Sequence, residues 1–282
     1  MVSFTDRERR EFVRNGFLVR DDLLSEDLLA SAYGAVVDAI DADPDDPADV
    51  IGAGYAANTD GVDQAPFADI AAEVHRAADA LVGDGALAPP GDGMQIALNF
   101  PDEDATATVP DPDRVGGHLD GYANFDENPE VSPFTIGAAV YIDDVLPRGG
   151  GFTVWPGSHR IAGAYFEDHA LETVGGKPNN SQLPAVGDDP GECNYDARLR
   201  EQYDPYEIAG DAGTVILWHS FLTHTAGTNA GEDIRMAAIA RFGHAGDWDG
   251  REAARDPFGD WPAMADVPLV EGGNPVTDPD RD

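Results

Sequence analysis

The hydrophobic period of this 282-residue chain changes near residue 93, and this change restricts the possible folds more than any other feature. Before it, apolar residues recur every three or four positions in the segments 26–40 and 66–81, which predicts two amphipathic helices. In the segment 94–100, large apolar side chains instead alternate with smaller or polar ones, among them Gln95 and Asn99. Period two predicts a strand with one apolar face. Helices followed by strands favour an α+β fold.

Helix start signals and later apolar runs add detail to this prediction. Thr5 and Glu8 have the spacing of a capping box, and Ser25 is a suitable N-cap for the helix that follows it. Short apolar runs between polar loops predict strands at residues 16–20, 134–142, 151–155, 213–220 and 235–242. We therefore expect an antiparallel sandwich or barrel with the helices packed on it.

The length suits one large domain, and we expect a single domain over residues 1–282. Within it, residues 1–90 would be mainly helical, residues 91–245 would form the β core, and residues 246–282 would be an irregular extension. The long polar loops 101–117 and 160–205 would shape a binding pocket, because loops on a rigid scaffold carry specificity.

Acidic residues greatly outnumber basic ones, with 54 Asp and Glu against 17 Lys and Arg and a formal net charge of −37. Binding to nucleic acid or to an anionic membrane needs basic clusters, so we expect neither partner. A charge of this size repels itself in dilute buffer, whereas at molar salt the Debye length falls to about 3 Å. The balance therefore predicts a protein of a salt-rich cytoplasm.

Other features of the sequence predict the same location. Cys193 is the only cysteine, so the chain forms no internal disulfide. No apolar run reaches the length of about 18 residues that a membrane span needs, and the charged N-terminal segment lacks the apolar centre of a signal peptide. We expect a cytoplasmic protein that acts on a small molecule, and the sequence leaves its oligomeric state open.

The pair His118 and Asp120 is the first candidate for chemistry. Two residues apart on a strand point to the same side, so an imidazole and a carboxylate could take two adjacent positions on a divalent metal. A second histidine from elsewhere would complete the two-histidine, one-carboxylate set of non-haem iron(II) oxygenases. The alternative is a histidine that simply pairs with a surface aspartate.

Several longer motifs follow in order. Residues 150–159 read Gly-Gly-Phe-Thr-Val-Trp-Pro-Gly-Ser-His, and residues 217–229 contain Leu-Trp-His, then His224, then Gly and Asn at the third and fifth positions after it. Arg235 lies eleven residues after His224. Together with a Gly-Phe-Leu-Val-Arg segment at 16–20, this set resembles the phytanoyl-CoA dioxygenase family over about residues 4–245. Members of that family are Fe(II)- and 2-oxoglutarate-dependent oxygenases with a double-stranded β-helix (jelly-roll, cupin-like) core.

The resemblance implies roles for individual residues. His118, Asp120 and His224 would be the metal ligands and the catalytic centre, and Arg235 would pair with the distal carboxylate of 2-oxoglutarate. A planar, permanently charged guanidinium suits a carboxylate because it makes two parallel hydrogen bonds. Gln95 and Asn99 match positions that some relatives use to hold this co-substrate, although both could belong to an exposed polar strand face.

Three further positions leave choices open. His219 competes with His224 as the third metal ligand; the spacing to Arg235 favours His224, and His219 is then expected to pack or to hydrogen-bond. Arg241 shares a strand face with Arg235 and would contact either an anionic group of the substrate or one of the many acidic side chains. Thr135 or Tyr141 would stand where some relatives have a residue near the co-substrate.

The function implied by the resemblance is hydroxylation of a small molecule, with decarboxylation of 2-oxoglutarate to succinate. It would require Fe(II), 2-oxoglutarate and O2, with ascorbate in support. The alternatives are a non-catalytic jelly-roll binding module and a cupin-type metalloenzyme that does not use 2-oxoglutarate. A chlorinating enzyme is disfavoured because halogenating relatives replace the metal carboxylate, whereas Asp120 is present here.

Overall fold

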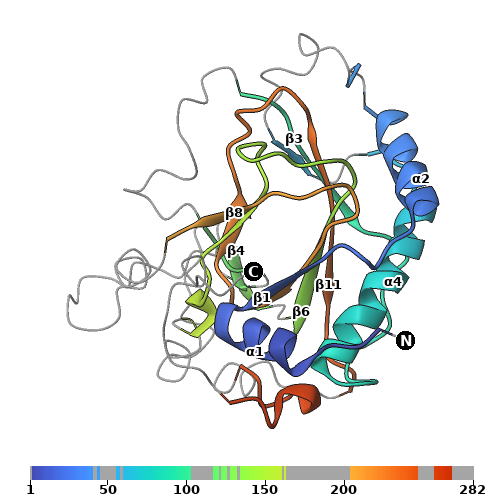
Figure 1. Ribbon diagram of the computed structural model, residues 1–282. Coiled ribbons are helices and arrows are strands. Elements are labelled where there is room, and N and C mark those ends of the chain that lie inside the picture. Colours follow the sequence, from blue (N-terminus) through green and yellow to red (C-terminus); the bar gives the residue numbers. More distant parts are fainter. Residues whose placement is uncertain are drawn as a thin grey trace.

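Figure 1 shows the protein as a computed structural model. The structure describes residues 2–40, 43–44, 55–57, 60–102, 117–120, 122–125, 128–131, 134–160, 162, 204–246 and 257–268. Most of the loops 101–117 and 160–205, Cys193 and most of the segment 246–282 lie outside these residues, so the expected role of the two loops stays a prediction. No helix in the described ranges is long and apolar enough to cross a membrane.

The described helices lie mainly in the first third of the chain. They are α1 (Asp6–Asn15), α2 (Glu26–Val37), α4 (Ala65–Val82) and the short 3-10 helix η2 (Pro262–Met264). The capping box expected at Thr5 is present, with the Thr5 hydroxyl accepting from the Glu8 amide and the Glu8 carboxylate accepting from the Thr5 amide. Ser25 caps α2 in the same way through the Leu28 amide, so local sequence signals set both helix starts.

Two antiparallel sheets form the core of the fold. The larger has the strand order β1 (Phe17–Arg20), β9 (Val215–His219), β6 (Ile136–Tyr141), β11 (Arg235–Phe242), β3 (Gln95–Asn99) and β2 (Tyr55–Ala57). The smaller has the order β10 (His224–Ala226), β7 (Phe152–Val154) and β8 (Tyr206–Ile208), and β4 (Tyr122–Phe125) pairs with β5 (Asn128–Val131). Strands β1 and β2 come from the part expected to be mainly helical, so that part also supplies both edges of the large sheet.

The two faces of the large sheet have different partners. One face carries residues such as Ile96, Val140 and Leu217 and packs on α4, which in turn packs on α2, in the main hydrophobic core. Figure 1 shows these two helices side by side along one flank of the sheet. The opposite face carries residues such as Ala237 and Trp218 and packs against the smaller sheet. Because successive side chains of a strand point to opposite faces, one face of the large sheet belongs to the core shared with the helices. The other face borders the space between the two sheets.

The register between β3 and β11 sets what faces that space. Arg235 pairs with Asn99, and Ile239 pairs with Gln95. Because side chains alternate, Arg235, Ile239 and Arg241 share one face of β11 with Gln95 and Asn99 beside them on β3. The period-two pattern of the segment 94–100 therefore predicted both the strand and the side of it that carries polar groups.

The segment 257–268 joins the core, which the sequence did not predict. Trp261 and Met264 are buried in the main hydrophobic core. The indole of Trp261 packs on Phe12 of α1, with ring centroids 5.3 Å apart. Large apolar side chains in an otherwise Asp-, Pro- and Gly-rich region are the reason residues 257–268 pack against the domain.

Replacing Gly137 tests how tightly the Trp218 indole packs between the two sheets. It pairs with Trp218 across β6 and β9, and a Cβ at this position would overlap the indole. We expect Gly137→Ala to lower the free energy of unfolding by about 1–3 kcal/mol, because the ring has to leave its place. Denaturant unfolding at molar salt measures this.

Gly34 in α2 is the matched control, because a Cβ there meets nothing within 4 Å. Gly34→Ala should raise the free energy of unfolding by up to about 1 kcal/mol through helix propensity. A Gly137→Ala protein as stable as the wild type would show that the indole is not confined as described.

Candidate metal centre

The segment 117–120 and the start of β10 bring three potential metal ligands together. The amide of His118 donates to the carbonyl of His224 at 2.9 Å, and the amide of His224 donates back at 3.2 Å, so the two histidines form an isolated antiparallel bridge. Asp120 lies two residues later, in a turn rather than on a continuous strand as the sequence predicted. The turn nevertheless brings the Asp120 carboxylate close to the paired residues His118 and His224.

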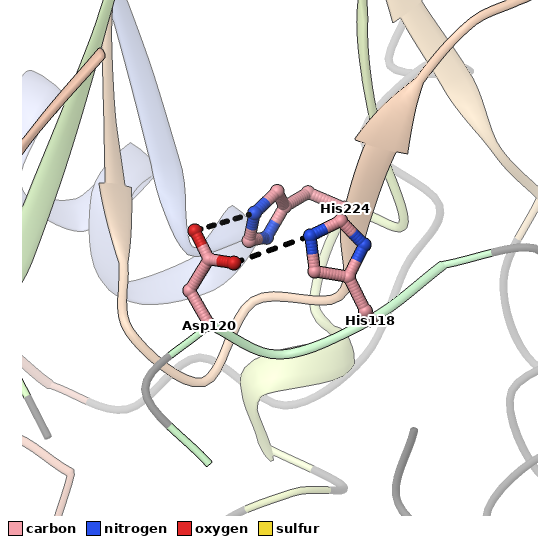
Figure 2. A group of neighbouring side chains, drawn as sticks. All are labelled: His118, Asp120 and His224. Carbon is pink, nitrogen blue, oxygen red and sulfur yellow. Dashed lines mark ion pairs between the residues drawn. The ribbon is translucent and has the colours of Figure 1, made fainter. Parts of the chain in front are cut away.

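The carboxylate of Asp120 lies to one side of the two imidazoles and faces both of them (Figure 2). Its Oδ1 is 3.2 Å from Nε2 of His118, and its Oδ2 is 3.3 Å from Nε2 of His224. One ligand atom from each of the three side chains lies within 4.8 Å of the others. Among the described residues, this is the group of histidine, cysteine or acidic side chains that could hold a metal ion.

The ring of His224 is fixed in one tautomer. Its Nδ1 lies 2.9 Å from the carbonyl of Leu222, and since a carbonyl only accepts, Nδ1 carries the proton. Phe152 stacks on the ring, with centroids 5.0 Å apart and planes 21° apart. In the neutral ring Nε2 is therefore a bare lone pair, and it faces a carboxylate oxygen of Asp120.

The charge states follow from burial and contacts. Burial lowers the pKa of His224 and outweighs the opposing effect of Asp120, so the ring is neutral near pH 7. Burial by itself would raise the pKa of Asp120. The surrounding side chains of His224, His118 and Arg241 together hold that pKa well below its usual value, so the carboxylate is ionised near pH 7. Nε2 of His224 and a carboxylate oxygen of Asp120 are both acceptors, so they repel each other where they meet. A cation bound at this place would attract both.

The three side chains stand in the wall of a cavity of about 520 Å³ between the two sheets. A cavity of this size suits a small molecule. Its lining residues are Gln95, Asn99, His118, Asp120, Phe152, Trp218, His224, Thr225, Ala226, Gly227, Arg235, Ile239 and Arg241. The six residues predicted as metal ligands or as co-substrate contacts, namely Gln95, Asn99, His118, Asp120, His224 and Arg235, are therefore all in this cavity wall.

Arg235 is buried, with 5% of its surface exposed. Its Nε donates to the carbonyl of Gly150 at 3.0 Å, and its Nη1 donates to the carbonyl of Ala97 at 3.2 Å. These bonds fix the guanidinium in the cavity wall. Gly150 has a φ of +76°, and a Cβ there would meet the Asn99 amide, which explains a glycine at this position of the motif.

Gln95 and Asn99 face the cavity but also hold the fold. Nδ2 of Asn99 donates to the carbonyl of Gly227 at 2.8 Å, which ties β3 to the end of β10. Oε1 of Gln95 accepts from Nη1 of Arg241 at 2.9 Å. Their expected contact with a co-substrate stays a prediction.

Arg241 contacts the predicted metal carboxylate, so it does pair with one of the acidic side chains. Its Nε donates to Oδ2 of Asp120 at 2.7 Å, and its Nη2 donates to the same oxygen. The even spacing from Arg235 placed Arg241 on this face, but a single sequence does not identify which acid it meets.

His219 lies away from the cavity, on the other face of β9. Its Nε2 donates to the carbonyl of Pro257 at 2.8 Å, and its Nδ1 accepts from the Phe221 amide at 3.0 Å. The ring stacks on Trp261, with centroids 5.4 Å apart and planes 13° apart. Both ring nitrogens are therefore used in packing the segment 257–268 against the domain.

The two positions suggested beside a co-substrate do not line this cavity. The Tyr141 hydroxyl donates to the carbonyl of Ile208 and accepts from the Phe152 amide at 2.8 Å, which joins the two sheets. Thr135 is buried at the start of β6. The sequence instead missed Phe152, Trp218 and Ile239, whose apolar character alone did not distinguish cavity lining from core.

The sandwich with a two-histidine, one-aspartate cluster between its sheets defines a jelly-roll protein with a candidate metal centre. The model of the phytanoyl-CoA dioxygenase (PhyH) family matches residues 12–237, and the chain belongs to this family. The match includes His118, Asp120, His224 and Arg235 and ends before Arg241. The family resemblance expected from the sequence motifs is confirmed.

Solved structures share the fold. The non-heme α-ketoglutarate-dependent carbocyclase SnoK from nogalamycin biosynthesis has a TM-score of 0.55 and 16% identity, covering 85% of this chain and 83% of that chain. The epimerase SnoN, in complex with Fe3+, α-ketoglutarate and nogalamycin RO, has a TM-score of 0.52 and 19% identity, with the same two coverages.

EctD from S. alaskensis, in its apoform, has a TM-score of 0.50 and 20% identity, covering 85% of this chain and 77% of that chain. A search by sequence among curated proteins finds no match. At these identities the structural likeness establishes the fold, and it confirms the expected α+β architecture with a double-stranded β-helix core.

The environment of His219 predicts a pH dependence of stability. Burial lowers the pKa of His219 from 6.5 to about 4 in the folded protein. The unfolded chain takes up a proton near pH 6.5 and the folded chain resists until about pH 4, so the free energy of unfolding falls as the pH is lowered between these values. The contribution of His219 is about 3 kcal/mol at most.

His219→Gln keeps a donor and an acceptor on the side chain but removes this titration. Denaturant unfolding between pH 7 and pH 4 should therefore show a shallower loss of stability in the variant than in the wild type, whatever their difference at pH 7. Parallel curves would contradict the assignment of His219 as a buried neutral ring.

Proposed function

We propose that the protein is an Fe(II)- and 2-oxoglutarate-dependent dioxygenase that hydroxylates a small molecule in a salt-rich cytoplasm. One observation carries the proposal: the lone pair of His224 Nε2 faces the carboxylate of Asp120 in the wall of a cavity that also contains the buried Arg235. A metal cation would attract both members of the first pair, and the guanidinium of Arg235 would pair with one carboxylate of a dicarboxylate co-substrate.

The donor set fits iron(II). Two imidazole nitrogens and one carboxylate oxygen are the ligands of non-haem iron oxygenases, and they leave three positions open. Ligands about 2.1 Å from a metal and at right angles are about 3.0 Å apart. The 3.2 Å between Oδ1 of Asp120 and Nε2 of His118 is close to that value. The Leu222 carbonyl holds the His224 ring so that Nε2 is the donor.

Arg235 favours a 2-oxoglutarate enzyme over a cupin-type metalloenzyme without this co-substrate. A planar, permanently charged guanidinium matches the distal carboxylate of 2-oxoglutarate, which can accept two parallel hydrogen bonds. The bonds to Gly150 and Ala97 orient the guanidinium before any ligand enters. A binding module would also hold an anion, but it has no need of a two-histidine, one-carboxylate set beside it.

When bound, iron(II) with 2-oxoglutarate and O2 supplies the oxidation of a C–H bond, with release of succinate and CO2. The side chains of this protein bind and orient the reactants and exclude water. Phe152 and Trp218 give the cavity apolar walls beside His224, and Phe152 also keeps the His224 ring from rotating. The low dielectric of such walls strengthens the pairing between Arg235 and a carboxylate.

The mass of the product distinguishes hydroxylation from the reactions named for proteins of the same fold. SnoK is described as a carbocyclase and SnoN as an epimerase. Hydroxylation adds one oxygen atom, ring closure removes two hydrogen atoms, and epimerisation leaves the mass unchanged. Mass spectrometry of the product therefore tests the hydroxylation part of the proposal, separately from the turnover of 2-oxoglutarate.

Removing the metal carboxylate should abolish turnover. We expect wild-type protein at molar salt, supplied with Fe(II), ascorbate and a panel of small molecules, to convert 2-oxoglutarate to succinate, and Asp120→Ala to lose this activity while its circular dichroism spectrum is kept. Asp27→Ala, which removes an exposed acid from the first turn of α2, should keep full activity. Succinate formation by Asp120→Ala would remove Asp120 from the metal site.

Arg235→Lys should separate the binding of co-substrate from that of metal. Lysine keeps the charge but cannot make the two-pronged contact, so we expect the affinity for 2-oxoglutarate to fall about 10- to 100-fold. The affinity for Mn(II), used as a probe, should stay within about twofold, because Nε and Nη1 of Arg235 donate to the backbone carbonyls of Gly150 and Ala97 and not to the three ligands. Calorimetric titration measures both, and an equal loss of the two affinities would contradict the role assigned to Arg235.

A further inference from the structure

Arg241 is held in a fixed position beside Asp120. It lies near the end of β11, where it pairs in register with Gly137 of β6. Its Nη1 donates to Oε1 of Gln95 at 2.9 Å, on the neighbouring strand β3. Its Nε donates to Oδ2 of Asp120 at 2.7 Å, and its Nη2 donates to the same atom. Two bonds from this rigid, planar group therefore hold the carboxylate, and the third ties the group to β3 of the large sheet.

Arg241 hydrogen-bonds to only one of the two carboxylate oxygens of Asp120. Both N–H groups go to Oδ2, whereas Oδ1 faces Nε2 of His118 at 3.2 Å. An oxygen that already accepts two charge-assisted hydrogen bonds is a poorer metal ligand, because its lone pairs are engaged. Oδ1 is thus left as the better donor.

We propose that Arg241 is a positioning residue that restricts Asp120 to one metal-binding oxygen. The inference rests on the function proposed above and adds a requirement to it. Two imidazoles and a single oxygen leave three of six positions open on an octahedral metal. A carboxylate that bound through both oxygens would leave two, which is one too few for a chelating 2-oxo acid together with O2.

A plain surface salt bridge is the competing explanation. Arg241 and Asp120 are partly exposed, with 32% and 14% of their side chains accessible, and such pairs contribute about 0–1 kcal/mol to stability. The two explanations differ in what is lost when Arg241 is replaced. A surface pair affects only stability, whereas a positioning residue affects how the metal-loaded site accepts 2-oxoglutarate.

Two variants of Arg241 distinguish the effect of its hydrogen bonds to Asp120 from the effect of its positive charge. Arg241→Met removes the charge and the hydrogen bonds, and Arg241→Lys keeps the charge without the two-pronged contact. We expect both variants to bind Mn(II) alone as tightly as the wild type or more tightly, since the second oxygen becomes available. We expect both to bind 2-oxoglutarate in the Mn(II)-loaded state about tenfold more weakly or worse.

A spectroscopic readout accompanies these titrations. Chelation of Fe(II) by a 2-oxo acid gives a visible charge-transfer absorption under anaerobic conditions, and both variants should show it at reduced intensity at a 2-oxoglutarate concentration that saturates the wild type. Arg76→Met, which removes a charge from a surface ion pair with Glu73 on α4, is the matched control and should behave as the wild type.

The outcomes distinguish the inference from the proposed function. A wild type that binds neither Mn(II) nor 2-oxoglutarate overturns the proposed function and the inference with it. A wild type that binds both, with 2-oxoglutarate affinity in Arg241→Met within about twofold of it, overturns the inference alone. Wild-type affinity in Arg241→Lys also overturns it, because charge rather than position would then be the cause.

Discussion

The carboxylate of Asp120 is the group on which the arrangement of the site depends. His118 approaches it from the same short segment, His224 from the smaller sheet and Arg241 from the larger one. With 14% of its side chain exposed, Asp120 is largely removed from water, and such a carboxylate is tolerated only when opposite charge and hydrogen bonds compensate for lost hydration. The fold supplies this compensation by closing two sheets around one cavity, so the architecture of the sandwich and the chemistry of the site have a common origin.

Positively charged side chains line the cavity, although the molecule as a whole is strongly negative. The chain has a net charge of −37 and only 17 basic residues, yet Arg235 and Arg241 both line the cavity. A positively charged, low-dielectric cavity attracts an anionic co-substrate at short range, while molar salt screens the acidic surface over distances longer than about 3 Å. The acid excess that we attribute to a salt-rich cytoplasm is therefore compatible with binding a dicarboxylate.

Short sequence patterns correctly predicted the features that depend on neighbouring residues, namely the helix starts and the polar face of one strand. The caps at Thr5 and Ser25 and the alternation of 94–100 identified helices and a strand face, because capping and side-chain alternation act over a few residues. The three-residue strands β8 and β10 were too short for a periodic signal. The candidate ligands were named through a family resemblance. Their meeting depends on pairing between His118 and His224, 106 positions apart, which no local pattern encodes. The same holds for Arg241 and Asp120, since the sequence offers 54 acidic partners and the register of the sheet selects one.

The central claim is that His118, Asp120 and His224 share one metal ion. Anomalous diffraction at the iron absorption edge, on crystals grown anaerobically with Fe(II), tests this most directly. The account predicts a single strong peak about 2.0–2.2 Å from Nε2 of each imidazole and from one oxygen of Asp120, facing the cavity that contains Arg235. A peak at other side chains, or a fully loaded crystal in which these three carry none, would contradict it.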